Sequence, residues 1–231
     1  MQPYEKLIQF THTFRKSALY LLAGVFITTF CFYLYSKPLF EILQNKLQQD
    51  LVFFTLAGPF LAHLKLSLGL SLFTLVPWFS ICLWKSLAVP FSLSKKSIIW
   101  FSLFSCLLFY SGALFCFQIT LPYGINFLLG FSSEQLQPII SINKFITFVA
   151  VFVLAFGVIF ELPIFMVFAA KTGIISRHTF AKNRRYAILA ISVIAALLTP
   201  TPDVVNMMLM GVPLYALYEI GIFILVVLRI K

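Results

Sequence analysis

The chain has 231 residues, of which 61% are hydrophobic and only 10% are charged, with a mean hydropathy of +1.00. A soluble domain carries about 25% charged residues, so this composition excludes a soluble domain. It predicts an all-α, polytopic membrane protein with a single transmembrane domain over residues 1–231. The formal net charge of +10 would suit nucleic acid. The basic residues flank apolar runs, however, and form no patch with exposed aromatic side chains, so nucleic acid is not expected as a partner.

Patterns that would indicate catalysis or metal binding are missing from the sequence. It has no GxSxG, no HExxH and no phosphate-binding loop. Its four cysteines form no CxxC, and they share no metal-ligand spacing with its three histidines. We therefore expect no enzyme activity, no metal and no cofactor.

Six apolar segments are predicted to span the membrane, at about 18–36, 66–90, 98–121, 146–170, 186–199 and 204–228. Before the first, Pro3–Lys16 mixes apolar and basic residues and is predicted to form an amphipathic helix at the membrane interface. No small-residue cleavage site follows the first segment, which favours a retained span over a signal peptide. The fifth is short for a span and stops at Pro200.

Proline and glycine mark special positions in these segments. Pro77, Pro163 and Pro213 lie inside the second, fourth and sixth segments, and each is expected to kink its helix. Gly211 and Gly221 in the last segment are expected to let another helix approach closely.

The distribution of Lys and Arg predicts that both termini lie on the inner side. With that orientation, thirteen basic residues fall inside and four outside. The inner loop Lys171–Arg185 is short and strongly basic. The outer loops, 37–65 and 122–145, are long, and the amphipathic stretch Leu39–Leu51 is expected to lie on the outer surface as a cap.

Two carboxylates lie deep in apolar segments, Glu161 within Val151–Ala169 and Glu219 within Val212–Val227. A charge at bilayer depth costs from about 3 to more than 10 kcal/mol, so each must face protein or water and is a functional candidate. Each lies ten positions before a basic residue, which is about 15 Å of helix. The two acids are therefore expected to share one layer of a helix bundle.

A structural role is the alternative for both acids. Glu161 lies just before Pro163, which frees a backbone carbonyl that a protonated Glu161 side chain would satisfy. Glu219 lies in Tyr218-Glu219-Ile220-Gly221, where it would hold neighbouring helices together. The pair Arg184-Arg185 is interpreted as an anchor on the inner side and not as a sorting signal.

Several short motifs follow one another in a distinctive order. They are Leu108-Phe109-Tyr110-Ser111-Gly112, Phe160-Glu161-Leu162-Pro163, Leu198-Thr199-Pro200-Thr201-Pro202-Asp203 and Pro213-Leu214-Tyr215 with Glu219-Ile220-Gly221. Together with Pro59, Phe60 and Lys65 before the second segment and Leu121-Pro122 after the third, this order resembles the TatC family. Members of that family are the multispanning core subunit of the twin-arginine protein translocase. Here Thr201 is inserted between the prolines of the turn.

The resemblance implies six helices in a cup-like arrangement with short fifth and sixth helices. It implies recognition of signal sequences and transport of folded proteins driven by the protonmotive force. The expected partners are signal-bearing folded proteins, an iron–sulfur protein among them, TatA/TatB-like single-span helices or further copies of the chain, and the lipid bilayer. The residues expected to contact a substrate or partner are Glu161, Arg15, Glu219 and Tyr215. The residues expected to form the structural turn are Pro200, Pro202 and Asp203.

The inner face departs from the family pattern. In the family, an N-terminal His-x-x-Glu-Leu-Arg-x-Arg motif and an acid in the first inner loop hold the twin arginines of the signal. Here Phe10 replaces the His, Thr13 replaces the Glu, Ser94 replaces the loop acid, and Arg15 is retained. Like charges repel, so we expect weak binding of a twin-arginine signal, unless Glu5 has taken over the role.

Residue composition also indicates in which membrane the chain resides. The chain has 28 Phe, and Lys outnumbers Arg, as in A+T-rich genomes. This favours the mitochondrial inner membrane, with a plastid thylakoid or a bacterial plasma membrane as alternatives.

Other functions that fit the two acids are an ion- or proton-coupled small-molecule carrier and a structural membrane subunit of a larger complex.

Overall fold

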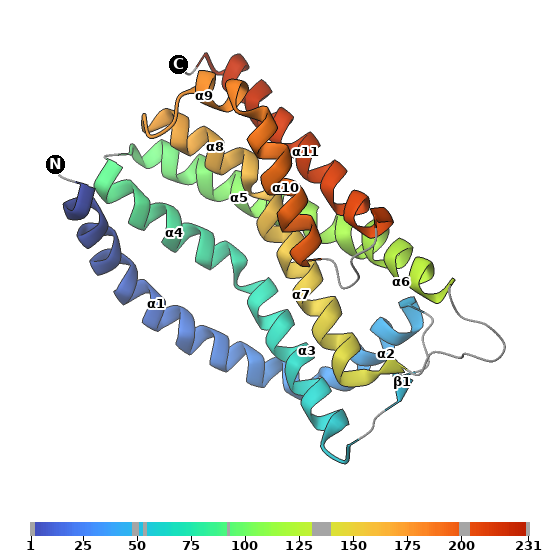
Figure 1. Ribbon diagram of the computed structural model, residues 1–231. Helices are drawn as coiled ribbons and strands as arrows, with labels where there is room; N and C mark the ends of the chain where they lie inside the picture. Colours follow the sequence, from blue (N-terminus) through green and yellow to red (C-terminus); the bar gives the residue numbers. More distant parts are fainter. Residues whose placement is uncertain are drawn as a thin grey trace. The chain divides into compact units, whose positions relative to one another are not determined.

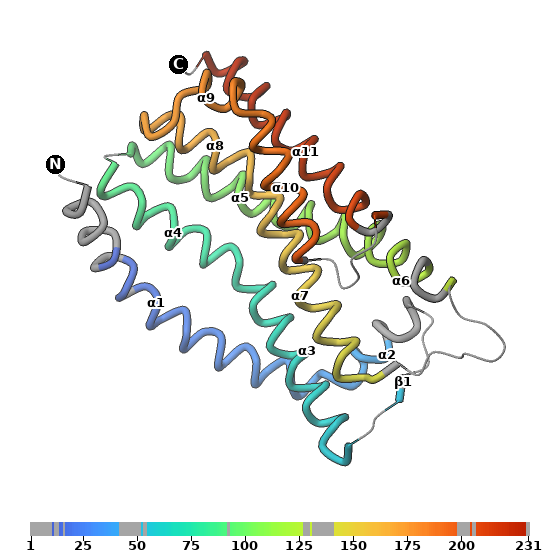
Figure 2. Tube along the Cα trace, viewed as in Figure 1, coloured from blue at the N-terminus to red at the C-terminus, as the bar shows by residue number. Residues whose placement is uncertain are grey.

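The computed structural model describes residues 3–47, 51–52, 55–91, 93–130, 140–198 and 204–229, and it is almost entirely helical (Figure 1). In further helical stretches, drawn grey in Figure 2, only the backbone is described. The α-helices are α1 Pro3–Leu34, α2 Ser36–Leu47, α3 Gly58–Thr74, α4 Val76–Phe91, α5 Lys95–Phe115, α6 Leu121–Leu129, α7 Ile142–Phe160, α8 Leu162–Lys171, α9 Arg177–Lys182, α10 Arg184–Leu198 and α11 Val204–Val227. The all-α prediction is confirmed.

Among the described residues, four helical stretches are long and apolar enough to cross a membrane, or five if α3 and α4 form one broken span. The four are Ser17–Leu34, Lys95–Asn126, Ile142–Lys171 and Met207–Val227. The predicted fifth span corresponds to α10, which has 15 residues. A helix that short spans only about 23 Å at 1.5 Å per residue, so the six-span count stays a prediction.

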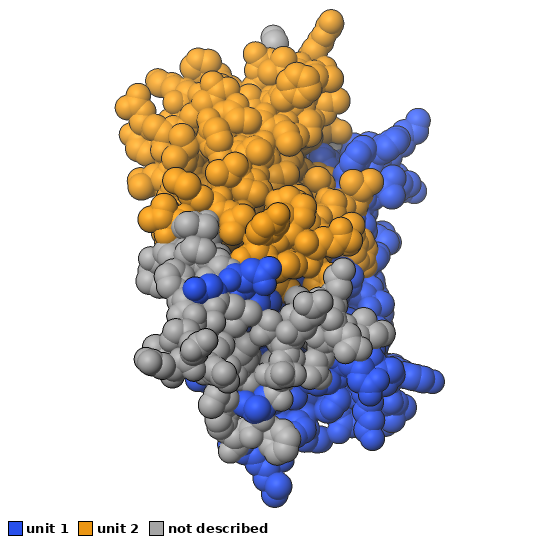
Figure 3. All heavy atoms as spheres, turned by 90° about the vertical axis from the view of Figure 1, so that its right-hand side faces the viewer, with its two compact units in different colours: residues 1–106, 125–154 blue, residues 107–124, 155–231 orange. Residues whose placement is uncertain are grey.

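The chain divides into two compact units, drawn blue and orange in Figure 3. Unit 1 comprises residues 1–106 and 125–154, and unit 2 comprises residues 107–124 and 155–231. The sequence predicted a single transmembrane domain and gave no sign of this division. Helices α5, α6 and α7 each contribute residues to both units.

In unit 1, α1 packs along α3 and α4 (Figure 1). Small and hydroxyl residues contribute to these contacts. The hydroxyl of Ser71 on α3 donates to the carbonyl oxygen of Val25 at 3.1 Å, and it also hydrogen-bonds Thr28. A Cβ at Gly24 would lie 2.9 Å from the ring of Trp78. Small residues at such contacts let helix backbones approach closely, which is how helices associate where no water drives them together. The other side of α1 is open, and Phe26 is 78% exposed.

The predicted second span is longer than expected and broken. It begins at Gly58 rather than at residue 66, and α3 and α4 meet at a bend of 49°. Pro77 follows the break at Leu75 and has no amide hydrogen to continue the hydrogen-bonding of α3. The kink predicted for Pro77 is confirmed, whereas Pro213 lies inside α11, which runs uninterrupted from Val204 to Val227.

Two segments predicted as long outer loops are partly structured in unit 1. Helix α2 covers most of the amphipathic stretch, and the short strands β1 Leu51–Val52 and β2 Ile140–Ser141 then pair in parallel. Leu51 lies opposite Ile140, and Val52 lies opposite Ser141. The pairing therefore ties the segment before α3 to the segment before α7.

A π-helix, Cys116–Thr120, connects α5 to α6. The amide of Leu121 donates to the carbonyl oxygen of Cys116, five residues earlier. Pro122 follows directly and cannot donate, and π-bulges are one of the few ways a helix absorbs such a position. The third span is thereby prolonged to Asn126, beyond the predicted end at residue 121.

In unit 2, α8 and α10 both pack on α11, and glycines set the close contacts. A Cβ at Gly221 would lie 2.5 Å from Sδ of Met166, which confirms the predicted close approach. The same prediction for Gly211 is wrong, because no described atom lies within 4 Å of a Cβ placed there. Gly112 and Gly157 make room for the rings of Phe160 and Phe109.

Candidate functional site

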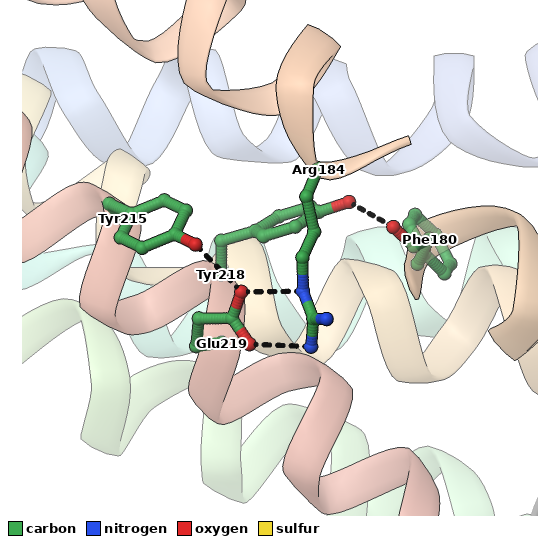
Figure 4. Close-up of polar contacts among 5 residues, drawn as sticks. All are labelled: Phe180, Arg184, Tyr215, Tyr218 and Glu219. Atoms are coloured by element: carbon green, nitrogen blue, oxygen red, sulfur yellow. Dashed lines mark hydrogen bonds and ion pairs between the residues drawn. The ribbon is translucent and has the colours of Figure 1, made fainter. Parts of the chain in front are cut away.

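Glu219 is held in a polar cluster on the surface of unit 2 (Figure 4). Its Oε1 accepts from Nε of Arg184 at 2.8 Å, and its Oε2 accepts from Nη2 of Arg184 at 3.0 Å. The hydroxyl of Tyr215 donates to Oε1 of the same carboxylate at 3.0 Å. The carboxylate therefore has a two-point contact with a guanidinium, the geometry in which this pair is strongest.

Local helix geometry places the members of this cluster. Tyr215 and Glu219 are four residues apart on α11, so their side chains share one face of the helix. Arg184 is the first residue of α10. Asn183 separates α9 from α10, and its carbonyl oxygen accepts from the amides of Tyr186 and Ala187 at 3.0 and 3.1 Å. These two bonds start the hydrogen-bonding of α10 at Asn183 and so fix the backbone that carries Arg184.

A second contact fixes α9 against α11. The hydroxyl of Tyr218 donates to the carbonyl oxygen of Phe180 at 2.8 Å, and the two rings meet edge to face with centroids 6.4 Å apart (Figure 4). Ser176 caps α9, because its Oγ accepts from the amide of Thr179 at 3.2 Å. Tyr218 and Glu219 therefore attach both ends of the α9–α10 turn to one stretch of α11.

The cluster is half-exposed, with 48% of the Arg184 side chain and 34% of the Glu219 side chain accessible. The hydrogen bond that Arg184 donates to Glu219, followed by the negative charge of Glu219, raises the pKa of Arg184 above its ordinary value. The guanidinium therefore stays charged throughout the physiological range. The ion pair neutralises Arg184 on α10 and Glu219 on α11. This lowers the free energy of placing these two helices at the edge of a membrane.

Glu161 occupies a different environment, at the break between α7 and α8. Its residue is only 7% exposed. The amide of Glu161 donates to Val158 at 3.1 Å, and its carbonyl oxygen accepts from Ile164 and Phe165 at 3.1 Å. The backbone therefore tightens by one residue at Glu161, just ahead of Pro163, and the acid lies inside protein rather than on the unit's surface.

The backbones of the two acids lie at one level of unit 2. Gly221 is two residues after Glu219, and Pro163 is two residues after Glu161. A Cβ at Gly221 would lie 3.4 Å from Cα of Pro163. This contact supports the predicted layer. Within it, Glu219 reaches Arg184 and Tyr215, while Glu161 is buried.

The remaining predicted site residues lie elsewhere. Arg15 is exposed on α1 in unit 1. The turn residues Pro200, Pro202 and Asp203 lie outside the described residues. Ser94, at the position of the family's loop acid, begins α5: its Oγ accepts from the amide of Ser97 at 3.2 Å. It thus serves as a helix cap.

Sequence analysis identified Glu219 and Tyr215 but missed their partner. Arg184 was assigned only as an anchor in a basic loop, because nothing in the spacing distinguishes it from Arg185. The useful signal was the acid itself, since a carboxylate in an apolar helix calls for a donor. Within the described residues, no three His, Cys, Asp or Glu side chains lie together as a metal site.

The long apolar helices, the broken span and the internally paired acid define a polytopic helical membrane protein. The profile of the TatC family, described as "Sec-independent protein translocase protein (TatC)", matches residues 9–213. The TatC protein of Desulforapulum autotrophicum is 36% identical over 212 residues, covering 88% of this chain and 77% of that protein. The TatC protein of Aquifex aeolicus is 35% identical over 197 residues, covering 82% and 81%.

The fold agrees with these sequence matches. A crystal structure of the twin-arginine translocase receptor TatC in DDM superimposes with a TM-score of 0.82 at 31% identity, covering 93% of this chain and 98% of the other. The chain therefore belongs to the TatC family, the membrane subunit of the Sec-independent twin-arginine translocase. The resemblance found in the sequence motifs is confirmed, and the carrier and structural-subunit interpretations give way to it.

Proposed function

We propose that this chain recognises signal sequences and supports the passage of folded proteins across a membrane, driven by the protonmotive force and without enzymatic chemistry of its own. The observation that carries the proposal is the family match over residues 9–213. The structural likeness at a TM-score of 0.82 supports it over almost the same length.

We propose six spans with both termini on the inner side. Helix α10 would be the fifth span and α11 the sixth, and the bent pair α3–α4 would be the second. The basic residues support this orientation, because the loop between α8 and α10 and the end of α11 both carry Lys or Arg. Modification of a cysteine at position 203 from the inner side would contradict it.

We assign different roles to the two acids. Glu219 would be structural, since its carboxylate is occupied by Arg184 and Tyr215. Glu161 would contact a passing signal or a partner helix. Its position deep in an apolar segment, at the break between α7 and α8, supports this, because a carboxylate at bilayer depth has a large desolvation free energy and is a functional candidate by default.

Recognition on the inner face is proposed to depend little on the arginines of a signal. The family's acids are replaced by Thr13 and Ser94, and Ser94 is engaged in capping α5. What remains is Arg15, which is exposed and has the same charge as the signal. Binding would then come mainly from the apolar part of the signal peptide.

Photo-crosslinking of signal peptides to the purified chain tests this proposal. We expect wild-type crosslinks to change little when the twin arginines become glutamines. Thr13→Glu with Ser94→Asp should raise crosslinking of the arginine form selectively, because Asp supplies a charge and still caps a helix. The matched control is Thr13→Gln with Ser94→Asn, which keeps size and cap but adds no charge.

Two results would contradict the proposal. If no signal peptide crosslinks above a scrambled peptide, the chain does not recognise signals. If wild-type crosslinks depend on the arginines and cluster near Glu5, recognition has moved along the N-terminus and persists in its arginine-dependent form.

Signal-bearing folded proteins and TatA/TatB-like single-span subunits are the proposed partners, with an iron–sulfur protein as a proposed substrate. Contact of the chain with further copies of itself is also part of the proposal. Purification in mild detergent followed by mass spectrometry of the bound proteins tests these partners. Finding only unrelated proteins would contradict them.

For location, we propose a bacterial-type plasma membrane. The two relatives described above are bacterial. The preference for the mitochondrial inner membrane rests on composition alone and gains no support from them. Imaging of the tagged chain in its own cells tests this, and a mitochondrial or plastid signal would contradict it.

A further inference from the structure

The loop between α8 and α10 carries a surplus of positive charge that the ion pair does not remove. From Lys171 to Arg185 there are five Lys or Arg side chains, and from Lys171 to Leu198 there is no Asp or Glu. Glu219 reaches in from α11 and pairs with Arg184. Arg177, Lys182 and Arg185 are all exposed.

Apolar side chains are also exposed in this loop and in the first two turns of α10. Ile174 is 55% exposed, Tyr186 is 64% exposed and Leu189 is 63% exposed. A soluble acidic partner would call for a polar surface around the charges. Tyrosine and aliphatic side chains interleaved with Lys and Arg are instead typical of the level at which lipid headgroups meet acyl chains.

The bases are held at that level by short connections. The candidate span that contains α8 ends at Lys171, and α10 begins at Arg184. The hydrogen bond from Tyr218 to Phe180 fixes α9 beside α11 (Figure 4). The charged side chains therefore cannot move far from the membrane boundary.

We propose that the surface formed by Arg177, Lys182 and Arg185, here called the loop surface, binds the phosphate headgroups of anionic phospholipids. Guanidinium groups form two-point contacts with phosphate oxygens, and an ammonium acts as a point charge. The pair between Arg184 and Glu219 has a part in this surface, because it neutralises Arg184 and orients the start of α10. The proposal concerns lipid and is independent of signal recognition.

Binding of short-chain phosphatidylglycerol to the purified full chain in uncharged detergent tests the proposal, with phosphatidylcholine of the same chain length as the comparison. The readout is the thermal midpoint as a function of lipid concentration. We expect phosphatidylglycerol to raise the midpoint at lower concentration than phosphatidylcholine, and the difference to shrink at high salt.

The test variant is Arg177→Gln/Lys182→Gln/Arg185→Gln. Each base near an anionic surface contributes about fivefold in affinity at low salt, so the triple variant should bind phosphatidylglycerol about a hundredfold more weakly. The matched control is Lys37→Gln/Lys65→Gln/Lys144→Gln, which removes the same charge from unit 1 and should keep wild-type affinity. Arg177→Lys/Arg185→Lys keeps the charge and should retain most of the binding, even if the triple variant fails to fold.

Three results would overturn the proposal. One is equal stabilisation by the two lipids. Another is an equal loss in the test and control triples, which would indicate a bulk charge effect. The third is stabilisation by glycerol phosphate or inorganic phosphate, or displacement of lipid by polyglutamate, at comparable concentrations, because the surface would then take soluble anions rather than lipid.

Discussion

The backbones of Glu161 and Glu219 lie at the same level of unit 2, yet their side chains have different surroundings. Glu219 projects from α11 to a half-exposed position, where Arg184 and Tyr215 occupy its oxygens. Glu161 lies at a helix break and is 7% exposed. An acid in an apolar helix is thus either matched by a donor from a neighbouring helix or placed where the helix itself is interrupted. The two positions therefore differ in exposure and in the local course of the helix, and we assign them different roles.

The largest expected effect is steric and concerns the packing around Glu161. A Cβ at Gly112 would lie 2.5 Å from Cγ of Phe160 and 2.8 Å from the carbonyl oxygen of Phe156. Backbone cannot yield easily, so Gly112→Ala should lower the free energy of unfolding by about 1–3 kcal/mol. Thermal unfolding in detergent measures it.

Gly211→Ala is the matched control for that substitution. It adds the same methyl group to α11 where no described atom lies within 4 Å. Since Ala favours helix over Gly by about 1 kcal/mol, we expect no loss of stability. Equal losses of stability in Gly112→Ala and Gly211→Ala would mean that close packing near Glu161 is not the cause of the loss.

The next effect concerns the ion pair. Arg184→Gln and Glu219→Gln should each lower the thermal midpoint by a few degrees, because each leaves a charged partner at the membrane edge without its counter-charge. The double variant should lose less than the sum of the two. In uncharged detergent without added lipid, Arg185→Gln removes the same charge from the neighbouring, exposed residue and is expected to be neutral. Additive losses in the double variant would remove the structural role assigned to Glu219.

The smallest effect concerns Tyr215. Tyr215→Phe removes one of the hydrogen bonds to Glu219 and leaves the guanidinium in place. We expect a smaller decrease in thermal midpoint than for Arg184→Gln, and no decrease when Glu219 is already Met, which has no oxygen to accept from the hydroxyl. Tyr186→Phe, at an exposed position on α10, is the control. A Tyr215 effect that persists without Glu219 would show that the hydroxyl acts through another group.

Sequence patterns predicted the all-α class, the family, the close approach at Gly221 and the kink at Pro77. Those features follow from local chemistry: a missing amide, a missing side chain, an apolar run. Both acids were also found from sequence, because charge at bilayer depth is conspicuous. The partner of Glu219 was not found, since a contact between residues 35 positions apart depends on how α10 and α11 pack.

Other differences have similar physical reasons. The π-helix before Pro122 needs one extra residue in a turn, and no residue type signals that choice. The open position of Gly211 depends on which face of α11 is covered, and the residues next to Gly211 in the sequence are apolar, so they do not distinguish a covered face from an open one. The role of Ser94 as a cap was hidden, because comparison with the family pattern showed only a lost acid.

The central claim is that Glu161 works in transport while Glu219 serves the fold. The direct measurement is the transport of a folded, signal-bearing reporter into vesicles that contain the chain and its partner subunits, normalised to inserted chain. We predict that Glu161→Ala abolishes most transport and that Glu161→Gln, which keeps a hydrogen-bonding end, is milder. The double variant Arg184→Gln/Glu219→Gln, which removes the ion pair without leaving a lone charge, should transport close to the wild-type rate. Normal transport by Glu161→Ala, or loss of transport in the double variant despite normal insertion and thermal stability, would contradict the account.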